Sequence, residues 1–199
     1  MAIRIDRLIL ALGLLPAVAA SAADAVLAPC IDCHGATGVA ARPGVPHIDG
    51  QHGQYMADSM RAFANETRKS STEAHKRVPR DALAAIVTHY AGQKAARPRQ
   101  ATDPAQVARG GAIYADRCAD CHMENGRESD KDAPIMARQD LDYLARQILA
   151  FRKGDRRFPT MMDDAFRGIA ESDLIAVAHF FAAQDPLAAP SGAKGRRRR

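Results

Sequence analysis

Apolar residues recur along the chain at the three- and four-residue spacing of amphipathic helices. The first part of the chain has this spacing around Tyr55–Phe63 and again around Leu83–Tyr90. A similar pair follows later, around Leu141–Phe151 and Leu174–Phe181. This period marks one face of a helix, whereas a half-buried strand alternates with period two. Because no segment shows sustained alternation, the sequence predicts an all-α fold.

The two pairs of predicted helices belong to an internal repeat. Residues related by an offset of 88 are Cys30 and Cys118, Pro46 and Pro134, Gln51 and Gln139, Tyr55 and Tyr143, and Phe63 and Phe151. From Ile86 onward the offset becomes 91, so the first copy is three residues shorter. Constant offsets indicate duplication of one structural unit. We expect two tandem domains, at 24–94 and 104–186, joined by a linker at 95–103.

All four cysteines lie in two copies of the pentapeptide Cys-x-x-Cys-His. The copies consist of Cys30, Cys33 and His34, and of Cys118, Cys121 and His122. This pattern is the attachment signature of c-type haem, in which both thiols bond to the porphyrin and the adjacent imidazole binds the iron. A dithiol redox pair or a shared zinc site would leave both histidines unexplained. We therefore expect two covalent haem c groups, with His34 and His122 as proximal iron ligands.

The composition agrees with small domains built around a large cofactor. The chain is 47% apolar and 26% charged, which is typical of globular proteins, yet only 5% of its residues are aromatic. Each predicted domain has fewer than 90 residues and therefore a small core. A buried porphyrin would supply apolar mass, so we expect the domains to fold with haem attached.

The formal charge of +5 lies at the two ends of the chain. Residues 1–22 carry +1 and residues 187–199 carry +5, which leaves −1 on the segment between them. The body of the protein is not basic, and a nucleic-acid partner is therefore not expected. The tail at 187–199 ends in four arginines, is predicted to be disordered, and is expected to contact an anionic membrane surface if it has a function.

The N-terminus has the pattern of a secretory signal peptide at 1–22. Arg4 and Arg7 precede an apolar run at 8–18, and Ala20-Ser21-Ala22 is a suitable cleavage triplet. The run is too short to span a bilayer, so a periplasmic location is expected. After cleavage, only 24–29 precede Cys30. We expect a truncated first helix, with haem 1 exposed on one side or covered by a partner protein.

A longer set of motifs surrounds the second pentapeptide. Gly110-Gly111-x-Ile113-Tyr114 precedes Cys118, and a Gln139-x-x-x-Tyr143 helix, Phe151-Arg152-x-Gly154, a methionine loop and a final helix follow it. This arrangement resembles the dihaem class I cytochromes c of the cytochrome c4 group, which includes the cytochrome subunit of flavocytochrome c sulfide dehydrogenase. The resemblance implies two class I cytochrome c domains, each wrapped around one haem.

The resemblance also suggests the sixth iron ligand of the second domain. Met161 and Met162 lie in the loop before the last helix, where a thioether would complete the coordination of the iron and raise its potential. By the spacing of the family to the last helix, Met162 is the expected ligand and Met161 the second choice.

The first domain departs from this pattern because its corresponding loop, 69–77, contains no methionine. His75 is the strongest iron ligand in that loop and would give a bis-histidine iron of lower potential. Two alternatives remain open. Met56 or Met60 would reach the iron from the preceding helix, or the sixth position would be vacant.

These features predict an electron-transfer protein rather than an enzyme. Two haems held close together would pass electrons from a dehydrogenase to a downstream carrier or oxidase. The chain would act either as a free carrier or as the haem subunit of a flavoprotein sulfide dehydrogenase. The alternative from another class is a haem enzyme that uses an open sixth site at haem 1 on a small sulfur or peroxide substrate.

Overall fold

The computed structural model describes residues 22–158 and 161–189. The expected signal peptide lies outside these residues apart from Ala22, and the expected tail lies outside them from residue 190 onward. The described residues are mainly helical, as predicted, and their one β-type feature is an isolated antiparallel bridge between Arg68 and Arg156. No helix among the described residues is long and apolar enough to cross a membrane.

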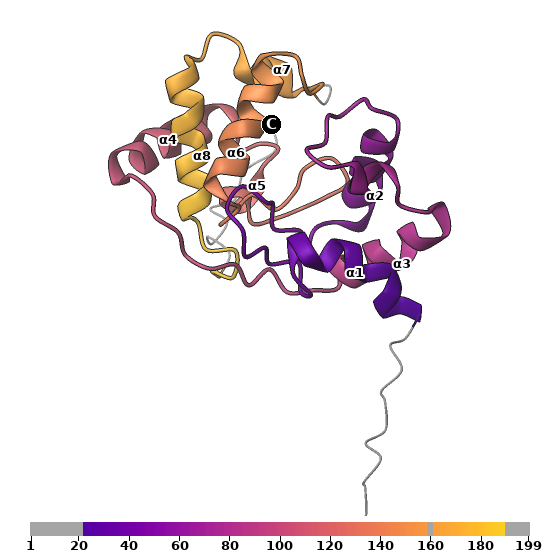
Figure 1. The fold of residues 1–199 in the computed structure, drawn as a ribbon. Coiled ribbons are helices and arrows are strands. Elements are labelled where there is room, and N and C mark those ends of the chain that lie inside the picture. The colour runs from indigo at the N-terminus through magenta and orange to yellow at the C-terminus, as the bar shows by residue number, and fades with distance from the viewer. Residues whose placement is uncertain (1–21, 159–160, 190–199) are drawn as a thin grey trace, which may run out of the picture.

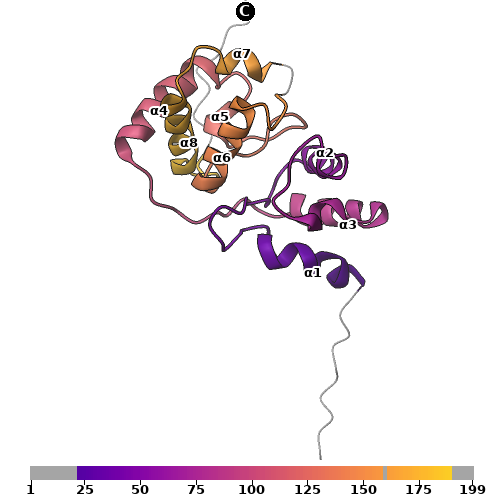
Figure 2. The same ribbon diagram turned by 45° about the horizontal axis from the view of Figure 1, so that its top comes forward.

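The helices form two groups that follow the sequence repeat. The first half, residues 22–94, contains α1 (Ala22–His34), α2 (Gly53–Ala64), the 3₁₀ helix η1 (Glu73–Lys76) and α3 (Arg80–Ala91). The second half, residues 104–189, contains α4 (Pro104–Arg117), α5 (Met123–Gly126), α6 (Leu141–Arg152), α7 (Met162–Phe166) and α8 (Glu171–Ala183). Figures 1 and 2 show α1, α2 and α3 on one side of the molecule and α4, α6, α7 and α8 on the other.

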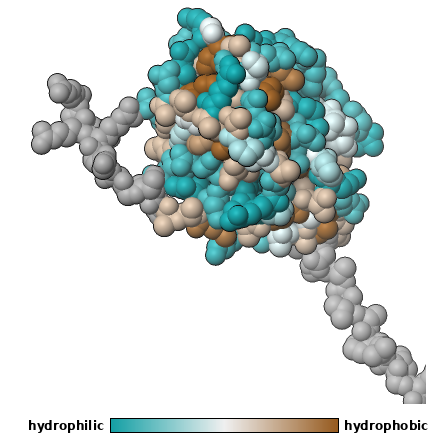
Figure 3. All heavy atoms as spheres, turned by 90° about the vertical axis from the view of Figure 1, so that its left-hand side faces the viewer, coloured by the Kyte–Doolittle hydropathy of each residue, from teal (hydrophilic) through white to brown (hydrophobic). Residues whose placement is uncertain are grey.

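The second half has the larger core, built on the crossing of α4 and α8. Asp103 caps α4 by accepting a hydrogen bond from the Ala105 amide (2.8 Å), and Pro104 begins the helix. Gly110 lies directly against the α8 backbone, where a β-carbon would overlap the carbonyl of Ala176. The two helices can therefore approach more closely than side chains would allow. On the face of the molecule shown in Figure 3, hydrophobic residues lie among hydrophilic ones.

The first half has a smaller core, formed where α1 and α2 pack on α3. Its buried members are Leu27, Met56, Ile86 and Tyr90. Within the described residues, α1 runs from Ala22 and contains the first pentapeptide at its C-terminal end. The contact between α1 and α3 is the counterpart of the α4–α8 crossing in this half, and it is smaller.

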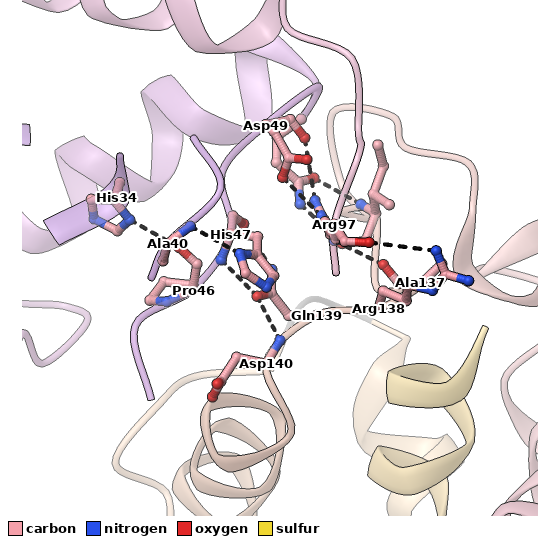
Figure 4. A network of polar contacts seen from close by, with 12 residues as sticks. His34, Ala40, Pro46, His47, Asp49, Arg97, Ala137, Arg138, Gln139 and Asp140 are labelled. Atoms are coloured by element: carbon pink, nitrogen blue, oxygen red, sulfur yellow. Dashed lines mark hydrogen bonds and ion pairs between the residues drawn. The ribbon is translucent and has the colours of Figure 1, made fainter. Parts of the chain in front are cut away.

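The predicted linker is partly buried between the halves, which its polar composition did not suggest. Arg97 and Asp49 form an ion pair (2.8 Å) whose two side chains are fully inaccessible. Arg97 also donates to the carbonyls of Ile135 (3.1 Å) and Ala137 (3.0 Å), as Figure 4 shows in part. A buried charge of this kind needs a partner and hydrogen bonds to offset its desolvation. The segment therefore fixes one half on the other.

Two glutamines related by the repeat complete this contact. The Gln51 amide receives a bond from the backbone N–H of Ile135 (2.7 Å) and donates to its carbonyl (2.9 Å). Gln139 does the same to His47, at 2.7 Å and 2.8 Å. Residues 47 and 135 differ by the same 88 positions as the glutamines, so the contact has approximate two-fold symmetry. We call the contacts among residues 47–51, 97 and 135–140 the junction.

Candidate functional site

The first pentapeptide ends α1 and places its histidine against a loop of the same half. His34 is buried, and its Nδ1 donates to the carbonyl of Pro46 (2.9 Å; Figure 4). Burial lowers the pKa of His34, so the ring is held neutral. With Nδ1 protonated, Nε2 carries the lone pair, which is the state that a metal ligand requires.

His75 is brought to the same place from η1. Its ring centroid lies 6.0 Å from that of His34, and its ring stacks on Phe63 at 4.7 Å. The Nδ1 atom of His75 lies 2.7 Å from Ser70 Oγ. The Ser70 hydroxyl already donates to the carbonyl of Thr72 (2.8 Å), so it accepts from His75. The Nε2 lone pair of His75 is therefore free as well.

The spacing of these two rings fits a shared iron. Because bonds from a metal ion to an imidazole nitrogen are about 2 Å long, two rings on opposite sides of one ion have centroids on the order of 6 Å apart. Burial, with His34 and Arg68 nearby, lowers the pKa of His75 to about 4, which keeps this ring neutral too. The geometry thus brings together the two histidines that the sequence suggested for haem 1.

The two methionines considered for haem 1 lie on α2. Met56 is part of the buried core of the first half, together with Leu27, Ile86 and Tyr90. This packing accounts for Met56 without an iron bond. Met60 is half-buried on the same helix. Of the candidates for haem 1, His75 is the one whose ring is recorded beside that of His34.

The second pentapeptide follows α4 and lies in the core of the second half. Cys118 is the C-cap of α4, and the Tyr114 hydroxyl donates to the His122 carbonyl (2.7 Å). The Nδ1 atom of His122 is buried and has no hydrogen-bond partner among the described residues. The His122 ring centroid lies 5.9 Å from that of Phe181. A buried ring nitrogen without a hydrogen-bond partner fits a site that a further bound group completes.

The two methionines of the second half differ in exposure. Met161 is 74% exposed, whereas Met162, at the start of α7, packs on the core cluster that includes Phe151 and Phe166. A ligand has to face the interior that holds the porphyrin. This placement favours Met162 over Met161, as the family spacing did.

The cysteines do not have the environment of reactive thiols. All four are free, and burial raises the pKa of Cys30 and raises that of Cys118 to about 11. Redox-active Cys-x-x-Cys pairs instead have a depressed thiol pKa. Among the described residues, no group of three or more Cys, His, Asp and Glu is arranged to hold a metal ion.

Known proteins with similar sequences decide the family. The cytochrome c family model matches residues 107–184. Cytochrome c4 of Azotobacter vinelandii is 30% identical over 157 residues, which cover 69% of this chain and 74% of the relative. This chain belongs to the cytochrome c4 family. The "thiosulfate dehydrogenase electron acceptor" of Thiomonas intermedia (strain K12) is 29% identical over 190 residues, covering 88% of this chain and 87% of that protein.

Solved structures agree on the fold of this cytochrome c4 relative. Reduced cytochrome c4 from Pseudomonas stutzeri superposes with a TM-score of 0.66 at 23% identity, covering 83% of this chain and 100% of the other. Thiosulfate dehydrogenase (TsdBA) from Marichromatium purpuratum gives 0.70 at 24% identity and covers 80% of this chain. The chain spans only 37% of that protein. The fold is therefore that of class I cytochromes c, as expected.

Family membership implies covalently bound haem c, and the donor set fits it. Each half offers two thiols and a neutral, buried imidazole on one short segment. Sequence reasoning missed a further pair of side chains between the halves, Arg68 and Arg156. They are also 88 residues apart, so the repeat itself carried the signal.

Proposed function

We propose that this chain is a dihaem cytochrome that transfers electrons in the periplasm. Its domains at 24–94 and 104–186 would each carry one haem c, bound through Cys30 and Cys33 in the first and Cys118 and Cys121 in the second. The observation that carries the proposal is the pair of neutral imidazoles, His34 and His75, whose ring centroids lie 6.0 Å apart in a half that lacks a methionine loop.

Haem iron supplies one-electron chemistry when it is bound, and the chain sets the potential at which this happens. His34 and His75 would hold iron 1 as a bis-histidine pair, and His122 with Met162 would hold iron 2. Methionine ligation raises the potential relative to histidine. Electrons are therefore expected to enter at the first half and to leave from the second.

The relatives support a sulfur-oxidising dehydrogenase as the electron donor. A protein with 29% identity is named as the electron acceptor of thiosulfate dehydrogenase, and its match covers most of both chains. We infer that this cytochrome accepts electrons from an enzyme of that class. The signal-peptide pattern at 1–22 supports an encounter in the periplasm. A flavoprotein sulfide dehydrogenase is the second candidate donor, because the motifs around the second pentapeptide also resemble the cytochrome subunit of such an enzyme.

Anaerobic stopped-flow absorbance tests this proposal on the purified haem-loaded chain. With a thiosulfate dehydrogenase and thiosulfate, both haems are expected to become reduced, and thiosulfate alone should reduce neither. Co-purification with a flavin-containing subunit would instead assign the chain to a sulfide dehydrogenase. Fewer than two haems per chain would contradict the proposal. Rapid binding of carbon monoxide by the reduced protein would also contradict it, and would favour an enzyme with an open sixth site.

A further inference from the structure

Two arginines related by the repeat meet between the halves. Arg68 follows α2 and Arg156 follows α6, and their backbones form the isolated antiparallel bridge. Each guanidinium reaches the tyrosine of the opposite half: Arg68 donates to Tyr143 (2.7 Å) and Arg156 to Tyr55 (3.3 Å). The arrangement is therefore reciprocal, like the glutamine contacts of the junction.

The two positive charges are held close together. Arg68 Nη2 and Arg156 Nη1 both donate to Gln147 Oε1, at 3.3 Å and 2.7 Å, so these nitrogens are no more than 6.0 Å apart. Like charges at this separation repel, and partial burial strengthens the repulsion. Their hydrogen-bond acceptors in the described residues, including Ser59 and the two tyrosines, are neutral.

The nearest acidic groups are engaged elsewhere. Asp58 accepts bonds from Gln54 (2.9 Å) and Arg61 (2.5 Å), and Asp155 pairs with Lys69 (2.5 Å). Neither Arg68 nor Arg156 forms an ion pair within the described part of the chain. The positive field is visible at Tyr55, where burial raises the pKa of the hydroxyl but Arg156 and Arg68 lower it by more.

An open pocket of about 220 Å³ lies at these side chains. It is lined by both arginines, Tyr55, Asp58, Ser59, Ala62, Thr67 and Arg157. We propose that Arg68 and Arg156, with the hydroxyls of Tyr55 and Tyr143, form a seat for an oxyanion, either a carboxylate or an inorganic anion such as sulfate. Planar guanidinium groups are suited to such ligands because they present parallel N–H donors.

The seat lies beside the candidate haem sites. Arg68 stacks over Phe63 (4.6 Å), and the same ring contacts His75. Arg156 stacks over Phe151 (4.3 Å), which belongs to the core cluster on which Met162 packs. A carboxylate in the seat would come from the haem propionates, and this source rests on the proposed function. An inorganic anion would not require it.

The test uses the full haem-loaded chain, with its haem content measured first so that failure of the dihaem proposal is seen separately. Potentials of Arg68→Gln and Arg156→Gln are compared with those of Arg157→Gln, which removes an equal charge from the same pocket. Loss of a guanidinium beside a bound carboxylate stabilises the ferric state, so the potential of at least one haem should fall in the first two variants and remain nearly unchanged in Arg157→Gln. Arg68→Lys should retain most of the wild-type value.

A second measurement separates the two anion sources and controls for folding. The protein is titrated in a calorimeter with sodium sulfate, and with sodium chloride of equal ionic strength as the control. If the anion is inorganic, sulfate should bind saturably and Arg156→Gln should abolish this binding. If propionates fill the seat, sulfate should not bind. Tyr143→Phe keeps both charges but removes one hydroxyl of the seat, so it should weaken anion binding or move the potential less than Arg68→Gln does. The proposal is overturned if Arg68→Gln and Arg156→Gln shift the potentials no more than Arg157→Gln and the wild type binds no sulfate.

Discussion

The two halves of this cytochrome c4 relative share a repeat but stabilise their sites differently. The second half closes its own core, in which eleven described residues are buried, by crossing α4 and α8. The first half buries four in its cluster. The second half supports the loop that contains Gly44 and His47. Gln139 and Asp140 of the second half accept hydrogen bonds from the backbone N–H groups of His47 and Gly44. The first half, with the smaller core, therefore depends more on contacts from the second half for its stability.

The largest effect is expected where the second half is self-contained. Gly110→Ala places a methyl group on the carbonyl of Ala176, and α4 and α8 must separate. We expect a loss of about 4 kcal/mol in the free energy of unfolding, at the upper end of single substitutions. Denaturant titration followed by circular dichroism measures it.

Gly111→Ala is the matched control for that substitution. Its β-carbon would lie 3.2 Å from the Phe180 ring, which is able to shift slightly. About 1 kcal/mol is expected here. Equal stability of the two variants would mean that the helix crossing is not the main support of the second half.

The free energy of unfolding should depend on pH through His47, which lies at the junction in the first half. Burial, together with Arg97, lowers the pKa of His47 from its ordinary value of 6.5 to about 4 in the folded protein. The neutral ring accepts a bond from the Ala40 amide (3.0 Å). The stability from this group is complete above pH 6.5 and is lost as the pH falls toward 4, by about 3 kcal/mol.

His47→Asn keeps an acceptor near Ala40 but removes the titration. The unfolding free energy of this variant should depend less on pH between 4 and 6.5 than that of the wild type. His52→Asn, at an exposed position, should leave the wild-type slope unchanged. A His47→Asn slope that equals the wild-type slope would show that the junction does not titrate through this residue.

Substitutions of the two methionines of the second half should differ clearly in their effect on the redox potential of haem 2. Met162→Ala would remove the sixth ligand of haem 2 and lower its midpoint on the order of 0.1 V, since axial ligands set potentials over a wide range. Met161→Ala should leave the midpoint nearly unchanged because that side chain is exposed. Spectroelectrochemical titration distinguishes them, and a larger shift in Met161→Ala would reverse the assignment.

The smallest effect concerns the paired glutamines. Gln139→Leu and Gln51→Leu each break two bonds across the junction and should each cost about 1–3 kcal/mol in stability. Only Gln139→Leu releases the loop whose Pro46 carbonyl holds His34. The NMR resonance of the His34 Nδ1 proton should therefore move in that variant alone, and movement in both would show that the two glutamine contacts do not act separately on the two halves.

The helices and both pentapeptides were predictable because their signals are local. Period and spacing identified α2, α3, α6 and α8, and the offset of 88 identified the repeat. The choice of Met162 over Met161 rests on the family spacing and stays a prediction; in the fold Met161 is the more exposed of the two.

The junction could not be predicted, because its contacts are made between side chains and distant backbone. Gln51 and Gln139 were visible as a repeated pair, but nothing local reveals that each binds the other half. Arg97 was assigned to a polar linker, and only the fold places it on Asp49. His75 was one of several candidates until η1 brought its ring opposite His34.

The central claim is that His34 and His75 bind one iron from opposite sides. Low-temperature electron paramagnetic resonance of the oxidised haem-loaded protein tests it, with His75→Ala beside His52→Asn as control. The account predicts two low-spin ferric signals in the wild type and in the control, and conversion of one of them to high spin in His75→Ala. A His75→Ala spectrum identical to that of the wild type would contradict it.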